Sequence, residues 1–135
     1  MSDMSQKNLP EKQAKKIIQQ YWDDEHFPVD PVTIAEKLGI TVMDTELPEQ
    51  VSGAIFKEPG KDPVITLHYT DSEARKRFTC AHEIGRYLSR LDDATSQDSF
   101  EFVDYRHRDS AKGEDPLEVF ANQFAADLLM PRTEV

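Results

Sequence analysis

Apolar residues at helical spacing mark the first predicted element of the chain. After a polar leader over residues 1–10, hydrophobic side chains recur at positions i, i+3, i+4 and i+7. This spacing predicts an amphipathic helix whose apolar stripe faces a core. We expect a flexible leader at residues 1–10 and a single domain over residues 11–135. The residues of the stripe are Ala14, Ile17, Ile18 and Tyr21.

A second, shorter helix is predicted where a capping signal precedes another apolar stripe. Asp30 followed by Pro31 is typical of a helix N-cap with proline at the first helical position. Gly39 suits the C-terminal end, because glycine adopts the left-handed conformation that closes many helices. The buried face of this helix is predicted to contain Ile34, Ala35 and Leu38.

Three short segments with strand character follow the second helix. They cover residues 40–43, 53–57 and 63–68, and they are rich in β-branched or apolar residues. Residues 58–62, Glu-Pro-Gly-Lys-Asp, join the last two segments and carry the proline and glycine of a turn. The pattern predicts a small three-stranded sheet, which we expect to be antiparallel.

The next predicted helix is the longest in the chain. Asp71 or Ser72 can cap it, and its apolar periodicity continues to about residue 90. Residues 91–99 are polar and aperiodic, so we expect a mobile loop there, followed by an extended segment at residues 100–105.

A strongly apolar helical pattern ends the chain after the irregular residues 106–114. Asp115 and Pro116 repeat the capping signal, and Pro131 is expected to stop the helix at about residue 130. A chain of 135 residues suffices for one compact domain with a hydrophobic core.

The charge balance of the chain narrows the range of partners. Lys and Arg number 16 against 26 Asp and Glu, which gives a formal net charge of −10. A field of this sign repels the phosphate backbone of nucleic acids, so we expect no direct DNA or RNA binding. The same charge favours a basic protein partner, although an acidic balance also serves solubility.

Targeting signals are absent from the sequence as given. The first 16 residues hold no apolar run of signal-peptide length, and no stretch of about 18 apolar residues occurs. The single cysteine, Cys80, cannot form an internal disulfide. We expect a cytoplasmic protein that does not enter a membrane.

The long helix carries most of a zinc-protease motif. In His-Glu-x-x-His, two imidazoles at i and i+4 bind Zn²⁺ and the glutamate acts as general base. His82 and Glu83 stand at the first two positions, but Arg86 stands where the second histidine belongs. A guanidinium has no lone pair to donate and keeps its positive charge, so Arg86 cannot be a ligand.

Two segments together resemble the ImmA/IrrE family of metallo-endopeptidases. They are residues 77–85, RFTCAHEIG, and residues 118–131, EVFANQFAADLLMP. Shorter matches at residues 28–31, 34–40 and 52–53 extend the resemblance over nearly the whole chain.

The resemblance implies a zincin-like α+β domain with defined roles for single residues. His82 would be the first metal ligand, Glu83 the general base and Glu118 the third ligand. Asn122, one helical turn after Glu118, would hold a group beside the metal. Zinc is the cofactor of the family, and we expect it to be absent or weakly bound here because of Arg86.

Members of this family typically cleave, or act beside, a helix-turn-helix repressor. The two proteins are often encoded side by side in phages, mobile elements and toxin–antitoxin-like pairs. The resemblance therefore implies a helix-turn-helix repressor or antitoxin-like protein as partner, and a role in transcriptional regulation.

Three explanations of Arg86 stay open at this point. The chain is a naturally degenerate, non-catalytic homologue, an engineered inactive variant, or a protein that recruits a replacement ligand such as His68 or His107. A further hypothesis places the guanidinium in the space of the zinc ion, where it would donate to Glu83 and Glu118.

Two functions follow from these explanations. The leading one is a catalytically impaired domain that binds the repressor or antitoxin-like partner. The alternative is an active zinc-dependent endopeptidase that cleaves this partner, with Arg86 an inactivating variant or with another ligand completing the metal site.

Overall fold

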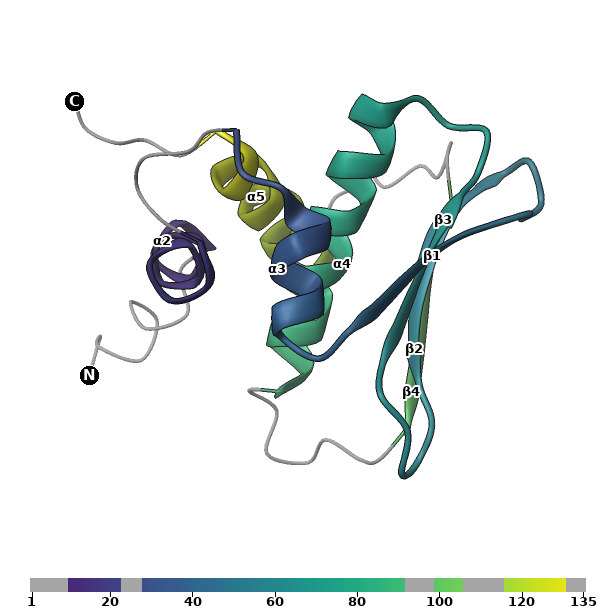
Figure 1. The fold of residues 1–135 in the computed structure, drawn as a ribbon, viewed down its shortest axis with the longest axis horizontal. Coiled ribbons are helices and arrows are strands. Elements are labelled where there is room, and N and C mark those ends of the chain that lie inside the picture. Colours follow the sequence, from purple (N-terminus) through teal and green to yellow (C-terminus); the bar gives the residue numbers. More distant parts are fainter. Residues whose placement is uncertain (1–9, 23–27, 92–98, 106–115, 131–135) are drawn as a thin grey trace.

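A computed structural model describes residues 10–22, 28–91, 99–105 and 116–130 (Figure 1). In this part of the chain, helices lie on one side of a four-stranded sheet, which confirms the α+β class. No helix among these residues is both long enough and apolar enough to span a bilayer. In chain order the elements are α2 (Pro10–Tyr21), α3 (Pro31–Lys37), β1 (Thr41–Thr45), β2 (Val51–Lys57), β3 (Val64–His68), α4 (Glu73–Leu91), β4 (Phe100–Tyr105) and α5 (Pro116–Leu129).

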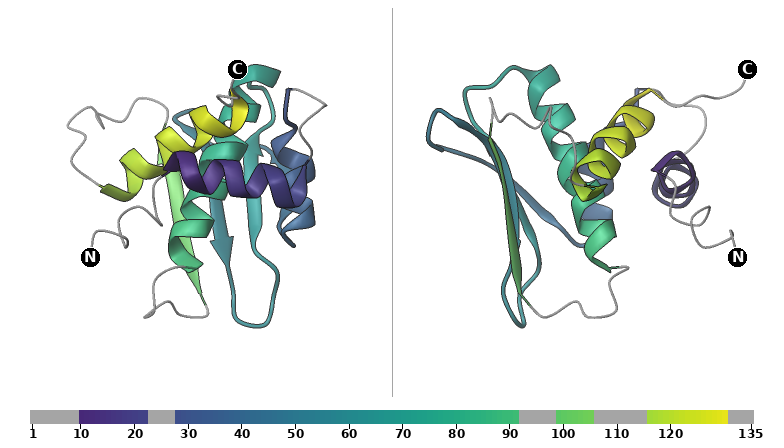
Figure 2. Two further views of the ribbon diagram at one scale, coloured as in Figure 1. Left: turned by 90° about the vertical axis from the view of Figure 1, so that its left-hand side faces the viewer. Right: turned by 180° about the vertical axis from the view of Figure 1, so that it is seen from behind.

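The helices form successive layers against one face of the sheet. Helices α3 and α4 pack directly on the strands, α5 packs on α4, and α2 packs on α5 (Figures 1 and 2). The apolar stripe predicted for α2 is buried at Ala14, Ile17 and Ile18. Helix α4 is therefore the central element, with the sheet on one side and α5 on the other.

The predicted ends of α3 have the expected geometry. The Asp30 carboxylate accepts a hydrogen bond of 3.1 Å from the backbone N–H of Val32, and Pro31 begins the helix. Gly39 has φ +88°, which is the left-handed conformation expected after the helix end. The buried residues Ile34 and Ala35 then fix α3 against the core.

The sheet differs from the prediction in two respects. It has four strands in the order β1-β3-β2-β4, and β1 runs parallel to β3 while the other pairs are antiparallel. The hairpin of β2 and β3 places β3 between β2 and β1, so β1 pairs with the strand that runs in its own direction. The predicted three-stranded antiparallel sheet is therefore wrong in strand number and in the orientation of β1.

The segment at residues 100–105, expected only to be extended, is the strand β4 on the other edge of the sheet. Its aromatic residues Phe100 and Phe102 pack against the core cluster beneath the helices. Because side chains alternate between the two faces of a strand, Asp104 faces the same way. Most of the predicted leader, the predicted loops around β4 and the proposed cap at Asp115 lie outside the described residues.

Two glycines let α4 approach its neighbours closely. A Cβ atom on Gly85 would lie 3.1 Å from Cδ2 of Phe124 in α5. A Cβ atom on Gly53 would lie 2.6 Å from the carbonyl oxygen of Thr66 and 2.7 Å from Cγ2 of Thr79 in α4. Larger residues at these two positions would hold α4 away from α5 and from β2.

We predict that Gly53→Ala destabilises the protein by about 1–3 kcal/mol, because the added methyl group meets a backbone oxygen that cannot move freely. Urea unfolding measures the effect. Adding Thr79→Ser removes the second obstructing atom and should recover part of the loss. Equal stability of Gly53→Ala and the unaltered protein would contradict the close approach described here.

Candidate functional site

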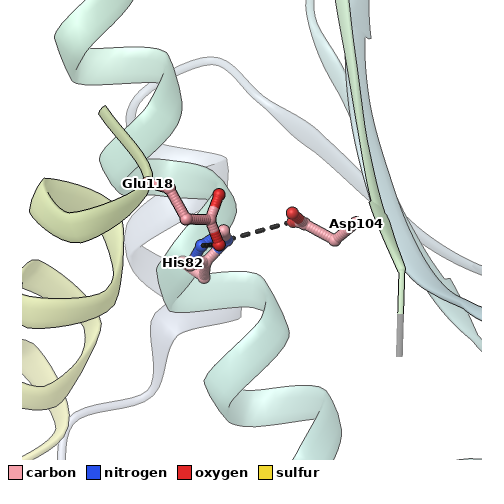
Figure 3. A group of neighbouring side chains, drawn as sticks. All are labelled: His82, Asp104 and Glu118. Carbon is pink, nitrogen blue, oxygen red and sulfur yellow. Dashed lines mark hydrogen bonds and ion pairs between the residues drawn. The ribbon is translucent and has the colours of Figure 1, made fainter. Parts of the chain in front are cut away.

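Three elements bring a group of charged side chains together inside the molecule. Figure 3 shows His82 from α4, Glu118 from α5 and Asp104 from β4 pointing toward one another. Arg86 lies one turn after His82 on the same helix, and each of these four residues is no more than 8% exposed. We call His82, Arg86, Asp104 and Glu118 the charge cluster.

The contacts of the charge cluster form a closed circuit in which positive and negative groups alternate. Nε2 of His82 lies 3.2 Å from Oε2 of Glu118, and Nδ1 of His82 lies 3.0 Å from Oδ2 of Asp104. Nη2 of Arg86 donates to Oε1 of Glu118 and, at 3.4 Å, to Oδ1 of Asp104. Each carboxylate therefore contacts both cationic side chains.

The position of His82 determines its protonation state. Burial lowers the pKa of His82, but the hydrogen bonds and charges of Asp104 and Glu118 outweigh this effect, and the pKa is raised. Both ring nitrogens lie near carboxylate oxygens, and only the imidazolium form carries a proton on each nitrogen. The surroundings of His82 thus favour its protonated form.

The guanidinium of Arg86 is fixed by more than the two carboxylates. Its Cζ atom lies 4.8 Å from the centre of the Phe102 ring, which also belongs to β4. A cation over an aromatic face is stabilised by the electron density of the ring. Hydrogen bonds and this contact together place the charge of Arg86 between α5 and β4.

Glu83 has a different environment from the one predicted for it. The residue is fully buried, and neither carboxylate oxygen makes a hydrogen bond among the described residues. Its Oε2 lies 3.8 Å from Nδ1 of His82. The hypothesis that Arg86 donates to Glu118 agrees with the structure, but its second acceptor is Asp104 and not Glu83.

Sequence reasoning missed Asp104. The alternation of Phe100, Phe102 and Asp104 indicates a common face, yet it does not reveal which element that face meets. Only the pairing of β4 with β2 brings Asp104 opposite α4. Knowledge of that non-local pairing was needed to find this residue.

Two of the remaining predicted residues, Asn122 and His68, are not members of the charge cluster. Asn122 is exposed on α5, so its predicted role beside a metal stays a prediction. His68 is buried at the end of β3, where its Nδ1 lies 3.1 Å from the hydroxyl oxygen of Thr70. His107 lies outside the described residues.

The guanidinium of Arg86 and a zinc ion would compete for the carboxylates of the charge cluster. The donor types are suitable, because His82, Asp104 and Glu118 each offer one ligand atom, and these atoms lie within 4.8 Å of one another. However, the guanidinium of Arg86 already contacts both carboxylates and would repel a divalent ion beside it.

We predict that Arg86→Met destabilises the protein by about 3–5 kcal/mol, because two buried carboxylates lose a shared partner. Urea unfolding at neutral pH measures the loss. Lys61→Met, which removes an exposed pair with Glu58, is the matched control and should leave the unfolding midpoint unchanged. A similar midpoint for both variants would show that the charge cluster does not support the fold.

A second prediction concerns pH. The folded-state pKa of His82 is raised above its ordinary value of 6.5, so its stabilising contribution is complete below pH 6.5. That contribution decreases as the pH rises through the folded-state pKa, by at most about 1.4 kcal/mol per pH unit. The free energy of unfolding of the protein, minus that of His82→Gln, should therefore fall with increasing pH. A difference that grows with pH would contradict the assigned imidazolium.

Comparison with known protein families identifies the family of the chain. The family model of the IrrE N-terminal-like domain matches residues 35–135, which include all members of the charge cluster. No curated protein matches the chain significantly. The matched stretch contains the helix with His82 and Glu83 and the helix with Glu118. The chain belongs to the ImmA/IrrE family of zinc-dependent metallopeptidases.

Proposed function

We propose that this chain is a metal-free member of its family, and that it acts by binding a protein partner instead of hydrolysing peptide bonds. One observation carries the proposal. Arg86, at the position of the second histidine of the motif, donates to Glu118, which stands at the position of the third ligand. The positive charge that a zinc ion would bring to this centre is supplied by a side chain.

The chemistry of the family requires groups that are engaged differently here. Catalytic zinc sites use three protein ligands and keep one position open for water, which the metal activates for attack. In this chain the motif supplies His82 and Glu118, and both are held by charged neighbours. Glu83 stands at the position of the general base. With arginine at position 86, however, the motif lacks the second histidine and supplies too few ligands for a catalytic zinc ion.

The negative net charge of the chain and its family both support a basic, DNA-binding protein as the partner. The net charge of −10 opposes binding to nucleic acid and complements a basic surface such as that of a DNA-binding protein. Relatives act on or beside helix-turn-helix repressors, as the sequence resemblance implies. The proposed partner is a helix-turn-helix repressor or antitoxin-like protein, which the chain binds without cleaving it.

A working zinc endopeptidase is the second candidate function, and Glu83 favours it. A carboxylate that is fully buried and lacks hydrogen bonds among the described residues is costly to the fold. Retention of such a group is expected where it has a chemical role. This candidate requires Arg86 to leave the charge cluster and another ligand to enter.

We predict that the unaltered protein, purified with zinc present, contains far less than one zinc ion per chain, and that Arg86→His contains about one. The histidine supplies the missing lone pair and removes the competing charge. Elemental analysis by mass spectrometry measures the content. Arg86→Gln, which removes the charge without adding an imidazole, should bind zinc weakly.

The same variants test the choice between binding and cleavage. Mixed with a helix-turn-helix repressor of the proposed kind, the unaltered chain should bind that protein and leave it intact, whereas Arg86→His with zinc should cut it. Arg86→His combined with Glu83→Gln should bind without cutting. Stoichiometric zinc and partner cleavage by the unaltered chain would sink the proposal in favour of the endopeptidase.

A further inference from the structure

We propose that Asp104 is a positioning residue for His82, and that it turns the imidazole so that Nε2 faces Glu118, whether residue 86 is arginine or histidine. Nothing in the motif assigns this task to a residue on β4. The inference rests on the proposed function only in treating Arg86 as the substitute for a metal ligand.

The two nitrogens of His82 face two different carboxylates. Asp104 lies 3.0 Å from Nδ1, and Glu118 lies 3.2 Å from Nε2, on the other side of the ring. In metal centres, a ligand histidine uses one nitrogen for the metal and commonly donates from the other to a carboxylate that fixes its orientation. Glu118 is thus the hydrogen-bond partner at Nε2, and Asp104 is the ion-pair partner at Nδ1, from which it can orient the ring.

The distances identify the nearer of the two cationic partners of Asp104. Asp104 is closer to His82, at 3.0 Å, than to Arg86, at 3.4 Å, and the longer contact exceeds the usual length of an N–H···O hydrogen bond. His82 is accordingly the principal partner of Asp104.

The sheet contains a β-bulge beside Asp104. Gly53 pairs with Asp104 and Val51 with Tyr105, so Ser52 is an extra residue in a β-bulge. Bulges bend a strand and re-aim the side chains next to it, and they are frequent beside active sites. The hydroxyl of Ser52 accepts a hydrogen bond of 3.0 Å from Nη2 of Arg75, which ties the bulge to α4.

Gly53, which pairs with Asp104, also lets the sheet and α4 approach each other closely. A Cβ atom on Gly53 would lie only 2.7 Å from Cγ2 of Thr79, so the absence of a side chain brings α4 close to β2 at this point. Thr79 precedes His82 by one turn of α4. Bulge and glycine together bring the orienting carboxylate within reach of the imidazole.

The first test measures zinc affinity in the Arg86→His background, by competition with a chelator of known affinity. Adding Asp104→Asn should weaken zinc binding about 10–100-fold, the usual effect of losing such a partner. Adding Glu101→Gln, the same neutralisation at an exposed position of β4, should leave the affinity unchanged. If the variant with Asp104→Asn binds zinc as tightly as its Arg86→His parent, the proposal is overturned.

The second test needs no metal and uses the chain with Arg86. Thermal unfolding is compared for Asp104→Asn, His82→Ala and the double variant. If a variant with His82→Ala does not fold, His82→Gln is used in place of His82→Ala. If Asp104 acts through His82, the double variant melts no lower than about the less stable single variant. Additive losses overturn the inference. Absence of zinc in Arg86→His would count against the proposed function, and this second test would still decide the role of Asp104.

Discussion

The structure depends on how buried charge is compensated between α4, α5 and β4. A charged group in a protein interior is tolerated only when partners of opposite charge replace the water that it has lost. His82, Arg86, Asp104 and Glu118 meet this condition together, because each contacts two members of opposite sign. Removal of any member leaves two others with one partner fewer, so the four residues form one unit.

The backbone brings these residues within reach of one another. The centre joins three elements, and glycines allow the close contacts of its helix: Gly85 where α4 meets α5, and Gly53 where α4 meets β2. The bulge at Ser52 bends β2 where it pairs with the end of β4 that carries Asp104. On the proposed function, the scaffold keeps the geometry of this centre while a side chain supplies the positive charge.

Much of this arrangement could be predicted from local sequence. The caps at Asp30 and Gly39, the stripe of α2 and the helix that carries His82 all follow from short-range patterns, and the resemblance of two helices identified the family. Glu118 was found in the same way, because its helix carries a distinctive string. These features depend on residues that are near one another in the chain.

The parts that escaped prediction depend on pairing between distant segments. The parallel orientation of β1 results from the insertion of β3 beside it, and the position of Asp104 results from the pairing of β4 with β2. Neither pairing has a signal in the segment itself. The second acceptor of Arg86 was assigned to Glu83 because that residue is its neighbour in the helix, whereas the actual acceptor comes from another element.

The guanidinium between α5 and β4 differs from a bound ion in one practical respect. An ion dissociates and is replaced according to its concentration in the cell, but a side chain cannot leave the protein that carries it. On the proposed function, the centre of this domain keeps the same occupant under zinc starvation and zinc excess. The proposed partner binding is then independent of the zinc concentration in the cell.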